Sequence, residues 1–175
     1  MKEYKKHKIY ARHSSVVNPN DRLSISVIKR SVLIVLSALR VELPCEISVL
    51  ITDERSIREI NREYRGVDKP TDVLSFPMQE LTPLQSLTID GWESPDDNKF
   101  DPDTGLLPLG EIVISATQTA KQALEYGHST KQETAYLVVH SVLHLLGYDH
   151  INEAEDKRQM RDIEKKIMAE LGFEN

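Results

Sequence analysis

The chain has 175 residues with 28 acidic and 22 basic side chains, which gives a formal net charge of −6. This length is typical of one domain, residues 1–175, that buries a sizeable core. No apolar run is long enough to span a bilayer and none follows the basic N-terminus, so we expect no membrane anchor and no secretory signal. A single cysteine, Cys45, excludes an internal disulfide, and the reducing cytosol is the simplest compartment, so we expect a cytoplasmic protein.

The spacing of apolar residues predicts alternating strands and helices in the first half of the chain. The expected elements are a strand at 9–12, a helix at 23–39, a strand at 46–51 that starts beside Cys45, a helix ending at Gly66 and a strand at 71–76. Thr52 and Asp53 are both plausible N-caps of the second helix. Ile57, Ile60 and Tyr64 form its apolar stripe.

An acidic excursion at about 79–108 interrupts this alternation. Seven acids and one base lie between Gln79 and Thr104, so this stretch alone accounts for the charge of −6. The whole excursion, 79–108, contains four prolines and Trp92, the only tryptophan of the chain. It is too long and too polar to be an ordinary connection, and we interpret it as an excursion from the domain. Because the rest of the chain is neutral, this acidity does not exclude an anionic substrate elsewhere.

The second half of the chain is predicted to be mostly helical. The expected elements are a strand at 109–115, a helix at 116–126, a helix that includes 135–146, and a last helix capped by Asn152 and ended by Gly172. Thr130 and Glu133 form a capping-box pattern before the third of these. Residues 135–146 are apolar almost all round, which is typical of a buried helix. The inner face of the last helix is formed by Ala154, Met160, Ile163, Ile167, Met168 and Leu171. Helices mixed with about four strands indicate an α/β or α+β fold.

The strongest functional pattern is His140-Ser-Val-Leu-His144-Leu-Leu-Gly147-Tyr-Asp-His150, which holds three of the six histidines. His140 and His144 share one side of a helix, because they are four residues apart. Gly147 can take the left-handed conformation that ends a helix and turns His150 back toward the other two. Three imidazoles with an open fourth position are typical of a catalytic zinc site. Nickel, cobalt and copper accept similar ligands, so the identity of the metal stays open.

The same spacing matches the zincin pattern H-E-x-x-H-x-x-G-x-x-H at every position but one. The general-base Glu of that pattern is replaced by Ser141. The metal-binding residues of a peptidase are therefore present, while its base is absent.

A second group of charged and polar side chains that could take part in catalysis or binding lies at a predicted helix end and strand start. It comprises Asn61-Arg-Glu-Tyr-Arg65, followed by Pro70-Thr-Asp-Val-Leu-Ser-Phe-Pro77. Together with Leu109-Gly-Glu-Ile-Val-Ile-Ser115 and the histidine segment, it resembles the YbeY family of bacterial endoribonucleases and rRNA maturation factors. The motifs follow in the family's order and cover most of the domain. Two features depart from the family: Ser141 replaces the usual Gly, and the acidic excursion is longer than expected.

The resemblance implies a small mixed sheet of about four strands covered by helices, with the histidine-bearing helix buried. It implies a single-strand-specific, zinc-dependent endoribonuclease that acts in 16S rRNA 3′-end maturation and late ribosome quality control. His140, His144 and His150 match the family's ligands for one Zn²⁺, and Arg65 matches its functionally important arginine. The expected partners are single-stranded rRNA and the small ribosomal subunit, with a ribosomal protein as a further candidate.

Several residues keep alternative interpretations. Without the resemblance, Arg65 is more simply an exposed arginine at a helix end, whereas with it the guanidinium suits the negative charge of a reacting phosphate. Asp149 is either a partner of an imidazole N–H or a turn residue. Glu111 is more simply a hydrogen-bonded strand residue than a proton carrier, and His128 is more simply a surface residue of a loop.

Two other functions compete with the endoribonuclease. One is a metal-dependent hydrolase of another ester or amide, including peptides, which Ser141 argues against. The other is a non-enzymatic assembly factor whose metal only ties the last two helices together, although a structural zinc normally has four protein ligands. Two routes of RNA cleavage also stay open, namely attack by water that zinc activates and attack by the ribose 2′-OH on a phosphoryl group that zinc polarises.

Overall fold

The computed structural model describes residues 7–83, 87, 99–149 and 154–173 of the chain. In these ranges four strands form one mixed sheet with the order β1-β2-β4-β3. The strands are β1 (Lys8–His13), β2 (Cys45–Thr52), β3 (Val73–Pro77) and β4 (Leu107–Ser115). β1 and β4 run parallel to β2, and β3 runs antiparallel to β4 at the edge of the sheet.

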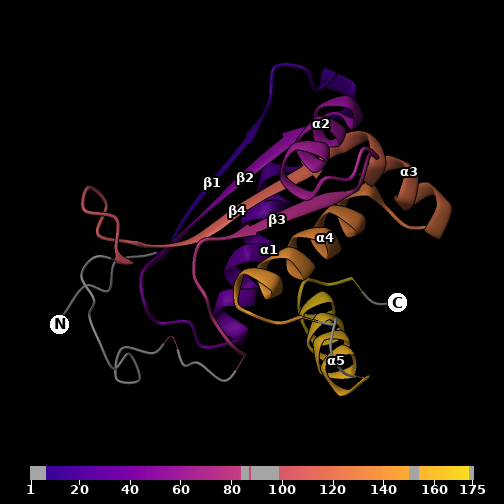
Figure 1. Cartoon of the computed structure of the whole chain (residues 1–175). Coiled ribbons are helices and arrows are strands. Elements are labelled where there is room, and N and C mark those ends of the chain that lie inside the picture. Colours follow the sequence, from indigo (N-terminus) through magenta and orange to yellow (C-terminus); the bar gives the residue numbers. More distant parts are fainter. Residues whose placement is uncertain (1–6, 84–86, 88–98, 150–153, 174–175) are drawn as a thin grey trace.

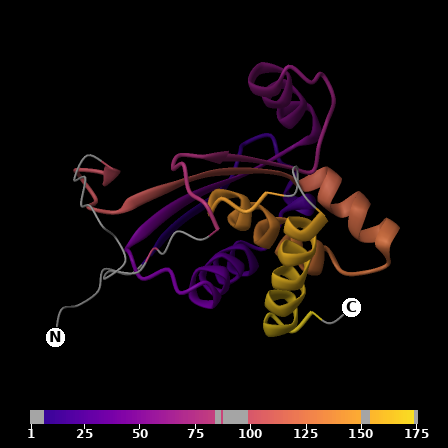
Figure 2. The same cartoon turned by 60° about the horizontal axis from the view of Figure 1, so that its bottom comes forward.

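Helices cover both faces of this sheet. The described part of the chain contains η1 (Pro19–Asp21), α1 (Ile25–Ala38), α2 (Glu54–Arg65), α3 (Ala116–Tyr126), α4 (Thr130–Leu145) and α5 (Ala154–Glu170). Figures 1 and 2 show α1 and α4 against one face of the sheet and α2 against the other, with α5 packed beside α4. The prediction of a small mixed α/β sheet covered by helices is confirmed. Among the helices in these ranges, none has the length and apolar character that crossing a bilayer demands.

The main hydrophobic core lies between the sheet and helices α1 and α4. β4, in the interior of the sheet, is buried along nearly its whole length, as expected for a strand with neighbours on both sides. Cys45 is fully buried at the start of β2, as the sequence predicts. α4 is buried over most of its length, which confirms the expected buried helix. A smaller apolar cluster on the opposite face joins Ile57 of α2 to Leu74 of β3 and Val113 of β4.

The start of α4 differs from the prediction. Ser129 is the N-cap, and its hydroxyl accepts a hydrogen bond from the backbone N–H of Gln132, so Thr130 and Glu133 do not form a capping box. Glu133 is only 2% exposed, and its carboxylate lies 3.1 Å from Nε2 of His128. His128 lies in the loop between α3 and α4, as expected, and its side chain is 21% exposed beside this buried carboxylate.

Other differences concern the ends and the sides of elements. Asp53 caps α2 and Gly66 ends it, as predicted. Tyr64 does not belong to the buried stripe of α2, because it is 67% exposed and packs edge-on against Phe76. Ala154 is likewise exposed instead of lying on the inner face of α5. The predicted cap of α5, Asn152, lies outside the described residues.

The acidic excursion is tied to the domain at several points. β4 begins at Leu107, two residues earlier than predicted, so the end of the excursion belongs to the sheet. Leu87 is 5% exposed, and its carbonyl accepts the backbone N–H of Glu42 at 3.0 Å. Leu81 packs against the main core. Trp92 lies outside the described residues.

Candidate functional site

Two imidazoles, those of His140 and His144, meet on the partly exposed side of α4. Their Nε2 atoms are 3.0 Å apart. The rings are nearly perpendicular, at 82°, with centroids 4.5 Å apart. A helix projects positions four apart from the same side, while the neighbouring Ser141 and Leu143 are fully buried in the core. The two residues that the sequence pattern predicts as ligands therefore lie side by side.

The separation of these nitrogens fits a shared metal ion. Zn–N bonds of about 2.0–2.1 Å at tetrahedral angles put two ligand nitrogens about 3.3 Å apart. The same separation also suits a hydrogen bond between neutral rings, which a bound cation would replace. The third predicted ligand, His150, lies outside the described residues. Within those residues, no three His, Cys, Asp or Glu side chains group as a metal site.

Glu164 of α5 belongs to this site, although neither spacing nor resemblance points to it. Its Oε1 atom lies 2.7 Å from Nδ1 of His140, and its side chain is 8% exposed. A carboxylate only accepts hydrogen bonds, so Nδ1 carries the proton and the lone pair of Nε2 faces His144. A carboxylate behind a ligand imidazole orients the ring and raises its basicity as a metal ligand.

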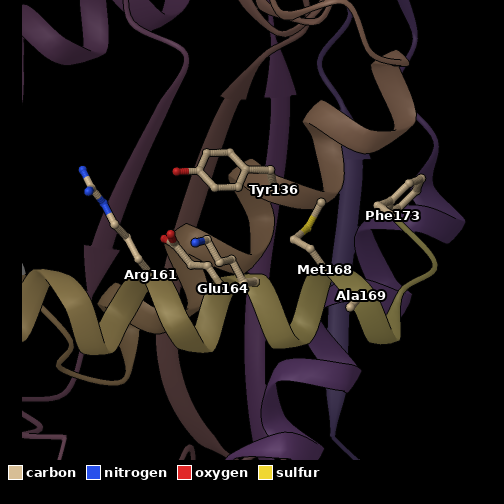
Figure 3. Close-up of a pocket in the computed structure, with 7 residues that line it drawn as sticks. Tyr136, Arg161, Glu164, Met168, Ala169 and Phe173 are labelled. Atoms are coloured by element: carbon tan, nitrogen blue, oxygen red, sulfur yellow. The ribbon is translucent and has the colours of Figure 1, made fainter. Parts of the chain in front are cut away.

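Glu164 is a charged residue on the buried face of an amphipathic helix, and this feature is visible in the sequence. It lies on the inner face of the helix, between the buried Met160 and Ile167, and points toward α4 (Figure 3). A charged residue at a buried position of an amphipathic helix requires a partner. The identity of that partner depends on how α5 packs against α4, which spacing along the chain does not predict.

The chain turns sharply after His144. Gly147 has φ +90°, and the N–H of Tyr148 donates to the carbonyl of Leu143 at 3.0 Å, which is the hydrogen-bond pattern of a Schellman helix end. A Cβ atom at position 147 would collide with the backbone carbonyl of Leu81. Both the left-handed conformation and the close approach therefore require glycine. The turn predicted at Gly147 is confirmed.

Arg65 reaches the same site from the other side of the sheet. It is the last residue of α2, and Gly66 follows it in a left-handed conformation with φ 69°. Arg65, His140 and His144 line one cavity of about 510 Å³. The wall between them is the edge strand β3, through Val73, Ser75 and Pro77. Three of the four predicted site residues thus come together across the edge of the sheet.

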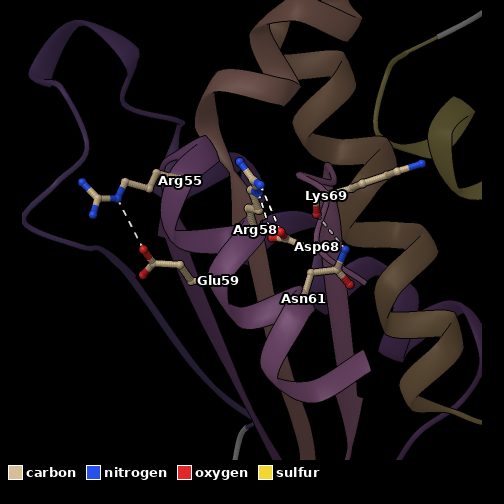
Figure 4. Close-up of polar contacts among 6 residues, drawn as sticks. All are labelled: Arg55, Arg58, Glu59, Asn61, Asp68 and Lys69. Carbon is tan, nitrogen blue, oxygen red and sulfur yellow. Dashed lines mark hydrogen bonds and ion pairs between the residues drawn. The ribbon is translucent and has the colours of Figure 1, made fainter. Parts of the chain in front are cut away.

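The turn after Arg65 is held by side chains of α2. Asn61 is buried, and its Nδ2 donates to the carbonyl of Lys69 at 2.9 Å. Arg58 donates to both carboxylate oxygens of Asp68, at 2.9 and 3.1 Å, and this contact lowers the pKa of Asp68 (Figure 4). These bonds pin the segment that joins α2 to β3, so the backbone of Arg65 is fixed relative to the cavity wall.

The structure also shows where Asp149, Glu111 and Ser141 lie relative to the histidines. Asp149 is exposed at the wall of the histidine cavity, while the carboxylate bonded to Nδ1 of His140 is Glu164. Glu111 is exposed on β4 and lines a different cavity, so it lies away from the histidines. Ser141 is fully buried, which turns position 141 toward the core and away from the cavity. The position of the zincin base therefore has no access to the site.

The sheet is mixed α/β, and one cavity at its edge combines imidazoles with a guanidinium, which are groups that bind and polarise anionic substrates. The family model described as Endoribonuclease YbeY matches residues 10–172. The chain therefore belongs to the YbeY endoribonuclease family.

Individual relatives agree with the family model. A protein named Endoribonuclease YbeY from Caldicellulosiruptor bescii is 43% identical over 163 residues, covering 90% of this chain and 96% of that protein. Another of the same name from Clostridium kluyveri is 42% identical over 156 residues, covering 86% and 94%. The solution structure of TM1509 from Thermotoga maritima matches with a TM-score of 0.58 at 22% identity, over 94% of this chain and 89% of that one. That structure supports the fold.

Proposed function

We propose that this protein is a zinc-dependent endoribonuclease that cleaves single-stranded rRNA in 16S rRNA 3′-end maturation and late ribosome quality control. The observation that carries the proposal is the pair of Nε2 atoms 3.0 Å apart in the cavity that Arg65 also lines. Membership of the YbeY family supports the class of reaction. The partners would be single-stranded rRNA, the small ribosomal subunit and a ribosomal protein that presents the RNA, and the compartment the cytoplasm.

One Zn²⁺ would be held by imidazole nitrogens of His140 and His144, with His150 from beyond the Gly147 turn. When bound, the ion polarises a phosphoryl oxygen or lowers the pKa of a water molecule. Glu164 keeps Nδ1 of His140 protonated, so the Nε2 lone pair stays directed at the ligand position. The protein contributes the fixed ring orientation, which needs no rearrangement during the reaction.

Arg65 would bind the phosphate that is cleaved. Attack by water and attack by the 2′-OH both build negative charge on a pentacovalent phosphorus. A guanidinium offers planar, paired N–H donors that match two phosphate oxygens. Because Arg65 and the histidines line the same cavity, a phosphate bound there at the edge of β3 would be within reach of both. The hydrogen bonds that hold the turn after Arg65 lower the conformational entropy lost when the phosphate binds.

The cavity favours a single strand over a duplex. The histidine side chains are recessed, and that of His140 is only 25% exposed. A flexible strand can bend one phosphate into such a cavity, whereas the phosphates of an A-form duplex are held on a rigid surface. We therefore expect a preference for single strands, because the side chain of His140 is only partly exposed.

Cleavage of a labelled single-stranded RNA carrying the 16S 3′ region tests the proposal. The zinc-loaded wild type is compared with His144→Ala and Arg65→Ala. The matched control is Arg55→Ala, which removes an arginine with an 87% exposed side chain from the first turn of the same helix. We expect the control to cut like the wild type and His144→Ala to lose both zinc and activity. Arg65→Ala should keep zinc and lose about 100-fold or more in rate, as for other oxyanion donors.

Two outcomes would contradict the proposal. Equal cutting by all four folded proteins would indicate a contaminating nuclease and favour an assembly factor with a structural metal. Cleavage of casein without cleavage of RNA would identify a hydrolase of another substrate class. Circular dichroism and zinc content, measured on every variant, separate loss of function from loss of the fold.

A further inference from the structure

A groove between α4 and α5 continues from the histidine cavity. The next cavity, of about 240 Å³, is lined by His140, Tyr136, Lys157, Met160, Arg161 and Glu164. A further cavity, of about 620 Å³, shares Tyr136, Arg161 and Glu164 with it and extends to Phe173, just beyond α5. The two cavities between α4 and α5 share three lining residues, and we call them together the α5 groove; His140 lines both its first cavity and the histidine cavity.

Three cations form a basic edge along the α5 groove. Lys157, Arg161 and Lys165 are four residues apart on α5, so they project from one side at intervals of about 6 Å along the helix axis. None of them forms a salt bridge with a carboxylate in the described ranges. Glu164 is engaged by His140, and the four other acids of α5 line neither cavity. Among the residues that line the two cavities, three cations therefore stand against one carboxylate, in a chain that is acidic overall.

Aromatic rings accompany these cations. Tyr136 is 38% exposed, and its ring stacks on His140 with centroids 6.0 Å apart and an angle of 28°. Its hydroxyl can donate a hydrogen bond to an anion. Figure 3 shows Tyr136 of α4 facing α5, with Arg161 toward one end of the groove and Phe173 at the other. Alternating cations and rings are the features that bind single-stranded nucleic acid.

We propose that the α5 groove binds the RNA strand on one side of the cleaved phosphate. The inference rests on the proposed function, because it takes the reacting phosphate to lie beside His140 and His144. A strand that leaves the histidine cavity past His140 reaches Tyr136, Lys157 and Arg161 in the next cavity, and Lys165 in the one beyond. In RNA, a base can stack on the ring while the phosphates bind the cations, so the strand uses both kinds of side chain. An acidic peptide would use the cations alone.

Substrates that are shortened stepwise from either end test this groove. The groove variant Arg161→Ala/Lys165→Ala removes two lining cations. The control Arg158→Ala/Lys166→Ala removes the same charge from exposed positions of the same helix that line neither cavity. In the wild type and the control, kcat/KM should rise about 10-fold or more as one flank of the RNA grows by a few nucleotides. In the groove variant this rise should disappear.

Binding of a fluorescent single strand, followed by anisotropy at several salt concentrations, gives a readout that does not need cleavage. Loss of two phosphate contacts should flatten the slope of log K against log salt by about 1.4 in the groove variant, but not in the control. The same length dependence and salt slope in both variants would overturn the proposal, as would binding of poly-glutamate in place of the oligonucleotide. A wild type that binds RNA with the expected slope but cuts none would refute the proposed function and leave the groove supported.

Discussion

Replacing Glu164 by glutamine separates the charge behind His140 from the shape of the side chain. Glutamine keeps the length, and its carbonyl oxygen can still accept the Nδ1–H of His140, so the 2.7 Å contact survives while the negative charge is lost. Partners behind ligand imidazoles change metal affinity by about 10- to 100-fold. We expect zinc to bind about 10-fold more weakly to Glu164→Gln and about 100-fold more weakly to Glu164→Ala, which also loses the contact.

The loss should also appear in thermal unfolding. At saturating zinc, a 10-fold weaker Kd removes about 1.4 kcal/mol of the stability that zinc adds, and a 100-fold weaker Kd removes about 2.7 kcal/mol. For a chain of this size 1 kcal/mol corresponds to about 2–4 °C, so the zinc-induced rise in Tm should shrink by about 3–6 °C and 5–11 °C, respectively. Without zinc, Glu164→Gln should unfold no earlier than the wild type, because a buried charge is replaced by a neutral group of the same shape.

Competition with a chromophoric chelator measures the zinc affinity, and calorimetry with and without zinc measures Tm. Glu170→Gln is the matched control, because it neutralises an exposed acid further along the same helix. Two results would refute the argument. One is an unchanged zinc affinity in Glu164→Gln, and the other is an equal loss of Tm with and without zinc, which would make Glu164 a packing residue only.

Three further predictions follow from buried groups. Ser141→Ala removes a fully buried hydroxyl that finds no hydrogen-bond partner among the described residues, so the free energy of unfolding in a denaturant titration should rise by about 1 kcal/mol, and a loss would show that the hydroxyl is bonded. Burial, opposed by the weaker attraction of His128, raises the pKa of Glu133 above its ordinary value of 4.5. As the pH rises from 4.5 toward the raised pKa of the folded protein, the folded state keeps a proton on Glu133 that the unfolded state has lost. The wild type should therefore lose stability relative to Glu133→Gln in thermal melts over this pH range. A stability difference that does not change with pH would contradict the burial argument. Burial also raises the pKa of Cys45 to about 12, so its thiol should react with a disulfide reagent only after denaturation, and fast reaction of the native protein would mean that β2 opens.

Those parts of the site that depend on neighbours along the chain can be predicted from the sequence. A spacing of four residues puts His140 and His144 on one side of a helix, and Gly147 predicts the turn, because both effects are decided within a few residues. The limit of such patterns is visible at the start of α4. Ser129 and Thr130 are adjacent hydroxyl residues with similar capping propensity, and only the structure shows that Ser129 is the cap.

Those parts that depend on packing between distant elements cannot be predicted in this way. Arg65 meets the histidines only because α2 and α4 lie on opposite faces of the sheet beside β3, and only the family resemblance singles it out. The contact of Glu164 requires the docking of α5 on α4. Leu81 and Leu87 anchor the acidic excursion, yet the short, proline-containing run of leucines to which they belong does not predict what they pack against.

The edge strand β3 lies between the histidine cavity and the smaller apolar cluster beneath α2. Leu74 packs against Ile57 beneath α2, while its neighbours Val73 and Ser75 line the histidine cavity. Since side chains alternate along a strand, a slip of one residue against β4 would put Leu74 into the cavity and Ser75 into the apolar cluster. A mispaired sheet would then lose its packing and its substrate site together. The pairing of one five-residue edge strand thus decides at once whether the apolar cluster is packed and whether the cavity is lined correctly.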